Sequence, residues 1–248
     1  MHTYRFFLPA ESLKQSTVKL TGADAHHALN VLKLKAGDSI IIFDGIETEY
    51  IARISSSKHN ELILSDLKES RRHKIQKPVI ELYAALVPKF DDIVQAATEL
   101  GVSAIFPVFT ERTKVRLSIK HYGKKVERWK RIAISASMQC GRIVLPEIYE
   151  PLSLHQALEE IKKNRLGLVA SLELESRPIL EVLNEIGCEF SYVAIFIGPP
   201  ADFTKNEISV AKSYGLIPVR IVPNTLRSET AALSALAVIS SFFYTRSL

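Results

Sequence analysis

From residue 79 onward, short apolar segments typical of buried strands alternate with longer segments that have helical periodicity. The strand candidates are 79–86, 104–109, 166–170, 192–197 and 218–222, and the helix candidates are 91–100, 124–140, 155–163, 179–186 and 205–214. Two helix starts are marked by capping boxes, Ser153 with Gln156 and Thr204 with Glu207. This alternation predicts an α/β domain in which helices cover both faces of a parallel sheet.

The first 70 residues have a different pattern, in which strand signals dominate. Residues 38–45 and 49–55 flank a glycine-containing turn, which indicates a hairpin, and residues 61–67 alternate apolar and polar side chains like a further strand. A helical interlude is expected at 23–34. A polar, basic segment at 69–78 then ends in proline, as linkers commonly do. We expect two domains, 1–72 and 78–248, the first a small β-barrel of a kind that often binds RNA.

The composition is that of a globular protein. The 248 residues are 47% hydrophobic and 24% charged, which is enough apolar material for an ordinary core. No secretory signal opens the sequence, and the longest nearly apolar run, 231–243, is broken by serines and too short to span a membrane. Cys140 and Cys188 make neither a disulfide framework nor a metal-ligand set. We therefore expect a cytoplasmic protein with no membrane partner.

Basic residues are concentrated between Arg112 and Arg131. This segment holds nine lysines and arginines against one acid, Glu127, in a chain of net charge +5. Such a run is either a solvated helix face or a contact for phosphates, and its density favours phosphates. The sequence thus favours a polyanionic partner such as RNA, bound in a strongly salt-dependent way.

Ligands of open parallel sheets bind beyond the carboxyl ends of the strands, where three loops qualify. These loops follow Ala170, Ile197 and Val222. The second, 197–203, combines a glycine with two prolines, and the third leads into a small-residue helix at 226–236 that Ser228 is expected to cap. Each loop alone could simply connect a strand to a helix, and the helix at 226–236 could simply be a capped and buried helix. Together the loops predict a cleft for a small ligand.

Several ligand motifs are missing. The sequence contains no glycine-rich dinucleotide fingerprint, no P-loop and no zinc-ligand spacing. His26 and His27 are adjacent and face different ways, which favours packing or RNA contact over metal binding. Cys140 has no evident base partner, so we expect a core cysteine rather than a nucleophile. No bound metal is expected.

A series of segments in fixed order resembles the ribosomal RNA small subunit methyltransferase E family over essentially the whole chain. The segments are Arg5-Phe-Phe, Ala25-His-His-Ala28, Val31-Leu-Lys-Leu-Lys35, Gly37-Asp38, Ala97-Thr-Glu-Leu-Gly-Val102, Glu111-Arg112, Glu127-Arg-Trp-Lys-Arg-Ile-Ala133, Gln139-Cys-Gly-Arg142, Ile197-Gly-Pro199 and Leu226-Arg-Ser-Glu-Thr-Ala-Ala-Leu233. The resemblance implies an N-terminal PUA-like β-barrel and a C-terminal SPOUT domain with a deep trefoil knot within about 170–235. It further implies a homodimer that uses S-adenosylmethionine to methylate N3 of a uridine in 16S rRNA.

The resemblance also assigns residues to roles. The cofactor-binding positions that it implies are Leu172, Ile197, Gly198, Pro199, Pro200, Ile221, Val222, Pro223, Leu226, Ser228, Thr230 and Ala231. The catalytic candidates are Arg227, to hold a phosphate or stabilise charge on a uracil oxygen, and the acids Glu229 and Asp202, either of which could be the general base. The resemblance and the placement of charge together identify seven RNA-binding candidates: Arg5, His27, Lys33, Lys35, Arg112, Arg116 and Arg142.

The cofactor loops depart from the family pattern. Pro200-Ala-Asp202 stands where the family usually has Glu-Gly-Gly, Val222 replaces a glycine and Asn224 an arginine. Asp202 restores a carboxylate two positions later. Two further readings therefore stay open: a non-catalytic RNA-binding or ribosome-assembly protein that keeps the fold, and a SPOUT methyltransferase with another RNA target.

Overall fold

The computed structural model describes residues 4–15, 17–58, 60–73, 78–115, 118–161, 165–187 and 190–246. The chain divides into two compact units, Met1–Ile75 together with Ser137–Leu145, and Gln76–Ala136 together with Pro146–Leu248. The sequence pattern contains no signal for the second segment of the first unit, because residues 137–140 are the end of a helix that begins in the other unit.

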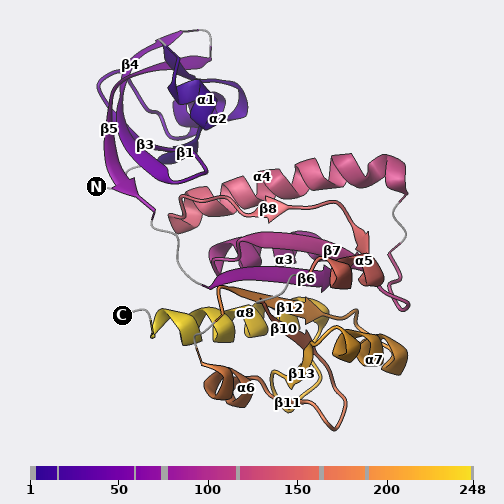
Figure 1. The fold of residues 1–248 in the computed structure, drawn as a ribbon. Coiled ribbons are helices and arrows are strands. Elements are labelled where there is room, and N and C mark those ends of the chain that lie inside the picture. Colours follow the sequence, from indigo (N-terminus) through magenta and orange to yellow (C-terminus); the bar gives the residue numbers. More distant parts are fainter. Residues whose placement is uncertain are drawn as a thin grey trace. The chain divides into compact units, whose positions relative to one another are not determined.

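The first unit is built on a five-stranded sheet with the order β1-β3-β4-β5-β2. Strands β1 and β3 pair in parallel, and the other neighbours are antiparallel. Its elements are β1 (Arg5–Phe7), α1 (Ala10–Leu13), β2 (Val18–Leu20), α2 (Gly22–His26), a π-helical turn at His27–Val31, β3 (Ser39–Phe43), β4 (Thr48–Lys58) and β5 (Glu61–Arg72). Register shifts between β4 and β5 add curvature, and the sheet curves around α1 and α2 (Figure 1).

The expected hairpin is confirmed, and its turn has a clear cause. The Asp44 carboxylate accepts hydrogen bonds from the backbone N–H groups of Ile46, Glu47 and Thr48 at 2.8 to 2.9 Å, which fixes the β3–β4 turn. The linker expected at 69–78 is wrong in its first half, because β5 continues to Arg72. Pairing with β4 extends the strand: Arg71 lies opposite Glu49 and forms an ion pair with it.

The second unit is an α/β domain with an eight-stranded sheet, in which every strand pair is parallel. The strand order is β11-β13-β10-β12-β6-β7-β8, with β9 also paired to β7. Its elements are β6 (Val79–Ala85), α3 (Phe90–Glu99), β7 (Ala104–Phe109), a 3-10 turn at Ile119–His121, α4 (Tyr122–Cys140), β8 (Glu147–Ile148), β9 (Leu152–Ser153), α5 (Leu154–Glu159), β10 (Arg165–Ala170), β11 (Arg177–Pro178), α6 (Ile179–Ile186), β12 (Tyr192–Ile197), α7 (Lys205–Ser213), β13 (Ile217–Arg220) and α8 (Ser228–Tyr244).

Alternate residues of each strand enter two different cores, one on each face of the sheet. On β6, Leu82 packs with α3, α4, α6 and α8, whereas its neighbour Tyr83 packs with α5 and α7. Tyr83 stacks between Phe106 and Phe196 of the adjacent strands, with ring centroids 4.3 Å apart on each side. The predicted α/β architecture with helices on both faces is therefore confirmed (Figure 1).

The predicted elements agree with the structure most closely where local signals are strong. Strands 104–109 and 192–197 and helix 179–186 have the expected limits, and both capping boxes are present. The helix expected at 155–163 ends earlier, at Glu159. The trefoil knot stays a prediction. Among the described residues, no helix is both long and apolar enough to cross a membrane.

Candidate functional site

Three loops at the carboxyl edge of the parallel sheet line one cleft. They follow the adjacent strands β10, β12 and β13, as the strand-end rule predicts. The cleft has an empty volume of about 510 Å³, including space open to solvent. Its lining residues are Ala170, Ser171, Leu172, Ile197, Gly198, Pro199, Pro200, Asp202, Val219, Arg220, Ile221, Val222, Asn224, Thr225, Leu226, Ser228 and Ala231.

The β12–α7 loop turns back on itself directly after the strand. A Cβ atom at Gly198 would lie 3.0 Å from the Phe203 ring and 3.2 Å from the Phe203 backbone nitrogen, so only glycine fits there without movement. The turn is closed by a hydrogen bond from the Asp202 N–H to the Pro199 carbonyl, 2.8 Å long. The Thr204 capping box then starts α7. Gly198 is thus required by the folding of the loop itself.

Hydrogen bonds connect the three loops to one another through Leu172. The Leu172 N–H donates to Asp202 Oδ2 of the β12–α7 loop at 3.0 Å. The Leu172 carbonyl accepts from Arg220 Nη2 of β13 at 2.7 Å. Arg220 also reaches the Glu173 carbonyl at 3.2 Å. The walls of the cleft are therefore one connected structure rather than three separate connectors.

Ser228 does not cap α8, and that prediction was wrong. The helix begins at Ser228 itself, and the N-cap position belongs to Arg227, with no side-chain capping bond. The Ser228 hydroxyl instead lies buried in the wall of the cleft. Both Ser228 Oγ and Arg220 Nε are buried polar atoms with no hydrogen-bond partner among the described residues. Both residues line the cleft, so these two atoms are available for hydrogen bonds to the polar groups of a ligand.

Arg112 contacts the β12–α7 loop through two backbone carbonyls. Its Nη1 donates to the Ala201 carbonyl at 2.6 Å and to the Phe203 carbonyl at 3.2 Å. Next to it, the Glu111 N–H donates to the buried carboxylate of Glu207 at 2.8 Å. The sequence assigned Arg112 to RNA, whereas in the structure this arginine supports the β12–α7 loop.

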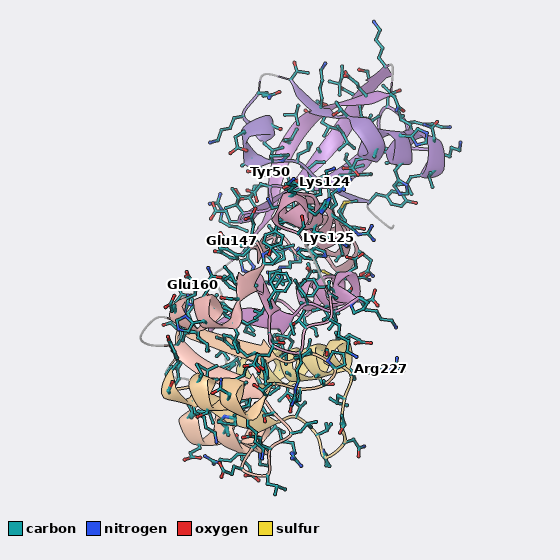
Figure 2. All side chains as sticks on the ribbon, turned by 90° about the vertical axis from the view of Figure 1, so that its right-hand side faces the viewer. Tyr50, Lys124, Lys125, Glu147, Glu160 and Arg227 are labelled. Carbon is teal, nitrogen blue, oxygen red and sulfur yellow. The ribbon has the colours of Figure 1, made fainter. Side chains whose placement is uncertain are left out.

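The structure brings most of the predicted cofactor residues together. Ten of them line the cleft, namely Leu172, Ile197, Gly198, Pro199, Pro200, Ile221, Val222, Leu226, Ser228 and Ala231, and the catalytic candidate Asp202 lines it as well. The remaining predicted positions, Pro223, Thr230, Arg227 and Glu229, are not among the lining residues. The exposed Arg227 lies beside α8 (Figure 2).

Six lining residues are not among the predicted site residues: Ala170, Ser171, Val219, Arg220, Asn224 and Thr225. Arg220 is the last residue of β13, so the strand-end rule could have found it. Its polar role was hidden because its partners, the carbonyls of residues 172 and 173, are distant in sequence.

In the first unit, two predicted RNA-binding arginines have internal partners. Arg5 forms a buried ion pair with Glu49 and donates to the Arg142 carbonyl at 3.1 Å. Arg142 donates to the Val144 carbonyl, and burial lowers its pKa to about 10. These contacts hold the segment after α4 against the sheet and disfavour RNA contact by either arginine. His27, Lys33 and Lys35 are exposed.

The basic segment of the second unit is less available than its composition indicates. Arg128 pairs with Asp91, and Lys130 pairs with Glu127. Lys114, Lys120, Lys124 and Lys125 are exposed and have no ion-pair partner in the described parts of the chain. Figure 2 marks Lys124 and Lys125 on α4. The predicted RNA contact Arg116 lies outside the described residues, as does Cys188.

No cluster of histidine, cysteine, aspartate or glutamate side chains within the described ranges could hold a metal ion. Cys140 is exposed and free, so the expectation of a core cysteine was wrong. It is the last residue of α4, whereas Met138 in the same turn packs against the core of the first unit.

Comparisons with known proteins agree with this geometry. Residues 76–240 match a model of the RNA methyltransferase domain, and residues 20–67 match a model of the RNA methyltransferase PUA domain. The ribosomal RNA small subunit methyltransferase E of Bacillus subtilis is 30% identical over 97% of this chain and 96% of its own, and that of Synechocystis is 31% identical over 96% and 77%. The enzyme of that name from Neisseria gonorrhoeae, solved with S-adenosylmethionine bound, has a TM-score of 0.84 at 28% identity, covering 97% of this chain and 98% of its own.

Proposed function

The chain belongs to the ribosomal RNA small subunit methyltransferase E family, and on this premise we propose that it transfers a methyl group from S-adenosylmethionine to N3 of a uridine in 16S rRNA. The observation that carries the proposal is the cleft at the sheet edge, with its unpartnered Ser228 Oγ and Arg220 Nε, in a chain that matches this family over nearly its whole length. A ribosomal RNA substrate implies that the protein works in the cytoplasm.

The residues of the cleft fit the chemical groups of S-adenosylmethionine. The apolar side chains of Ile197, Ile221 and Leu226 offer a surface for a flat base, and Arg220 and Ser228 offer donors for polar groups of the ligand. When bound, the cofactor supplies an electrophilic methyl group on a sulfonium. The rigid loops around Leu172 would orient it, and positioning of this kind accounts for much of the rate in group transfer.

We assign the RNA contact of the second unit to the start of α4. Its first turn contains Lys124 and Lys125 and no acid, and Lys120 and His121 precede it (Figure 2). Cations at a helix N-terminus oppose the helix dipole, and an RNA phosphate there would relieve that repulsion. In the first unit, His27, Lys33 and Lys35 remain the proposed contacts. A uridine in folded RNA must leave its stack to react, which suits binding by two units.

Methylation of uridine N3 also requires the loss of its proton. Both Asp202 oxygens accept backbone N–H groups, from Leu172 and from Phe203. Because both Asp202 oxygens already accept hydrogen bonds from the protein, we favour Glu229, in the first turn of α8, as the general base. The side chain of the nearby Arg227 is exposed and makes no hydrogen bond within the described residues, so it is available to a uracil oxygen or a phosphate of the RNA.

We further propose a homodimer. Leu172, which lines the cleft, is exposed, as are Leu174 and Leu180 further along the chain, and Leu174 is 98% exposed. Exposed apolar side chains of this kind are typical of a protein contact surface. Light scattering coupled to gel filtration tests the dimer, and a monomer at micromolar concentration would contradict it.

The activity is tested by two measurements on the intact protein. Isothermal titration with S-adenosylmethionine should show binding; no detectable binding would favour a non-catalytic RNA-binding protein that keeps the fold. Incubation with 30S subunits lacking base methylation, followed by reverse transcription, should then give a new stop at a single uridine of 16S rRNA. A stop in another RNA would indicate a different substrate, and an Arg227→Ala variant serves as the low-activity control.

A further inference from the structure

Asp202 occupies a backbone conformation that side chains rarely adopt. Its φ angle is 61°, in the left-handed region, where any residue other than glycine is disfavoured. Aspartate is among the residues that tolerate this region, because its short polar side chain can form local hydrogen bonds. An unfavourable conformation in the wall of a binding cleft calls for a compensating contact.

The Asp202 carboxylate provides that contact. One oxygen accepts the adjacent Phe203 N–H at 2.8 Å, and the other accepts the Leu172 N–H at 3.0 Å, thirty residues earlier in the chain. The first bond is local and stabilises the turn. The second joins the β12–α7 loop to the β10–β11 loop, and both loops line the cleft.

The second bond completes a connection around the cleft. Leu172 is bound through its N–H by Asp202 and through its carbonyl by Arg220, so the loops after β10 and β12 and the end of β13 meet at one residue. Asp202 and Arg220 are both half-buried, and their charges stabilise these bonds more than neutral partners would. Loss of the carboxylate would leave Leu172 held from one side only.

We propose that Asp202 is a positioning residue that holds Leu172 and thereby fixes the width of the cleft for the cofactor. This inference rests on the proposed function, because the ligand is S-adenosylmethionine. It differs from a role as general base, because here the carboxylate acts on the cleft through Leu172 and not directly on the RNA.

The test compares Asp202→Gly and Asp202→Asn with a matched control, Asp66→Gly. Asp66 also has a left-handed backbone, with a φ of 52°, but lies in the first unit. Glycine relieves the backbone at both positions, so what distinguishes position 202 is the loss of the carboxylate and its two hydrogen bonds. We expect the dissociation constant for S-adenosylmethionine to rise about tenfold in Asp202→Gly, to rise less in Asp202→Asn, whose amide keeps one acceptor oxygen, and to stay within twofold in Asp66→Gly.

Two outcomes would overturn the inference. The first is an unchanged dissociation constant in Asp202→Gly, which would make Asp202 a turn residue only. The second is a lost methylation rate with unchanged cofactor affinity in Asp202→Asn, which is the result for a general base. Amide exchange of residues 171–173 in the cofactor-free protein separates this test from the proposed function. Faster exchange in Asp202→Gly supports the positioning role even if wild-type protein fails to bind S-adenosylmethionine, and unchanged exchange refutes it.

Discussion

Replacing Arg112 with alanine should weaken cofactor binding and leave RNA binding almost unchanged. The side chain donates to the carbonyls of Ala201 and Phe203 at 2.6 and 3.2 Å, which fixes the outer side of the β12–α7 loop. Hydrogen bonds from a charged donor contribute about 1.5–3 kcal/mol, and the exposure of Arg112 places this pair near the lower end. If the cofactor binds only the loop conformation that Arg112 stabilises, losing about 1.5–2 kcal/mol of that stabilisation corresponds to a roughly 10- to 30-fold higher dissociation constant.

The assay pairs cofactor titration with RNA binding measured over a range of salt concentrations. An arginine that contacts an RNA phosphate contributes roughly 0.7–0.9 to the slope of log affinity against log salt, whereas a loop-supporting arginine contributes almost nothing. Lys114→Ala is the control, since Lys114 is exposed in the same basic segment. A shallower salt slope in Arg112→Ala with unchanged cofactor affinity would refute the reasoning and restore Arg112 as an RNA contact.

Three further predictions concern other contacts. Gly198→Ala should raise the dissociation constant of the cofactor several-fold in titration, because its Cβ would meet Phe203 at 3.0 Å; unchanged binding would show that the loop can move. Glu49→Gln should lower the free energy of unfolding in urea by about 3 kcal/mol, because Arg5 stays buried without its counter-charge; an unshifted midpoint would contradict this. The pKa of His73 lies below its usual 6.5, because the side chain is partly buried and lies near the charged Arg142 and Arg71. The contribution of His73 to the free energy of unfolding is therefore full above pH 6.5 and falls as acid protonates the imidazole. Melting curves recorded over a range of pH should show a flatter pH dependence for His73→Gln.

Local signals were enough to predict much of the second unit. Capping boxes at Ser153 and Thr204 depend on residues three positions apart, and both form as expected. The strand-end rule located the cleft, because parallel strands place all their carboxyl ends at one edge. Strand limits such as 104–109 followed from apolar runs bounded by polar residues.

Roles that depend on distant partners could not be read in the same way. Charge density alone could not separate Arg112, which binds loop carbonyls 89 and 91 residues away, from the exposed Lys124. For the same reason Arg5 was assigned to RNA, although Glu49, 44 residues later, pairs with it in the interior. Ser228 fits an N-cap by type, but the helix begins one residue earlier than that role requires, and Ser228 lines the cleft instead.

The discontinuity of the first unit has a practical consequence for engineering. Residues 137–145 belong to it, and Met138 fills part of its core. An isolated fragment that stops at residue 75 would expose apolar surface, and it would leave Arg5 and Arg71 without the carbonyls of Arg142 and Gly141. A chimera that exchanges the first unit between relatives must therefore transplant two stretches of sequence and keep the register of α4, since most of that helix, residues 122–136, belongs to the recipient.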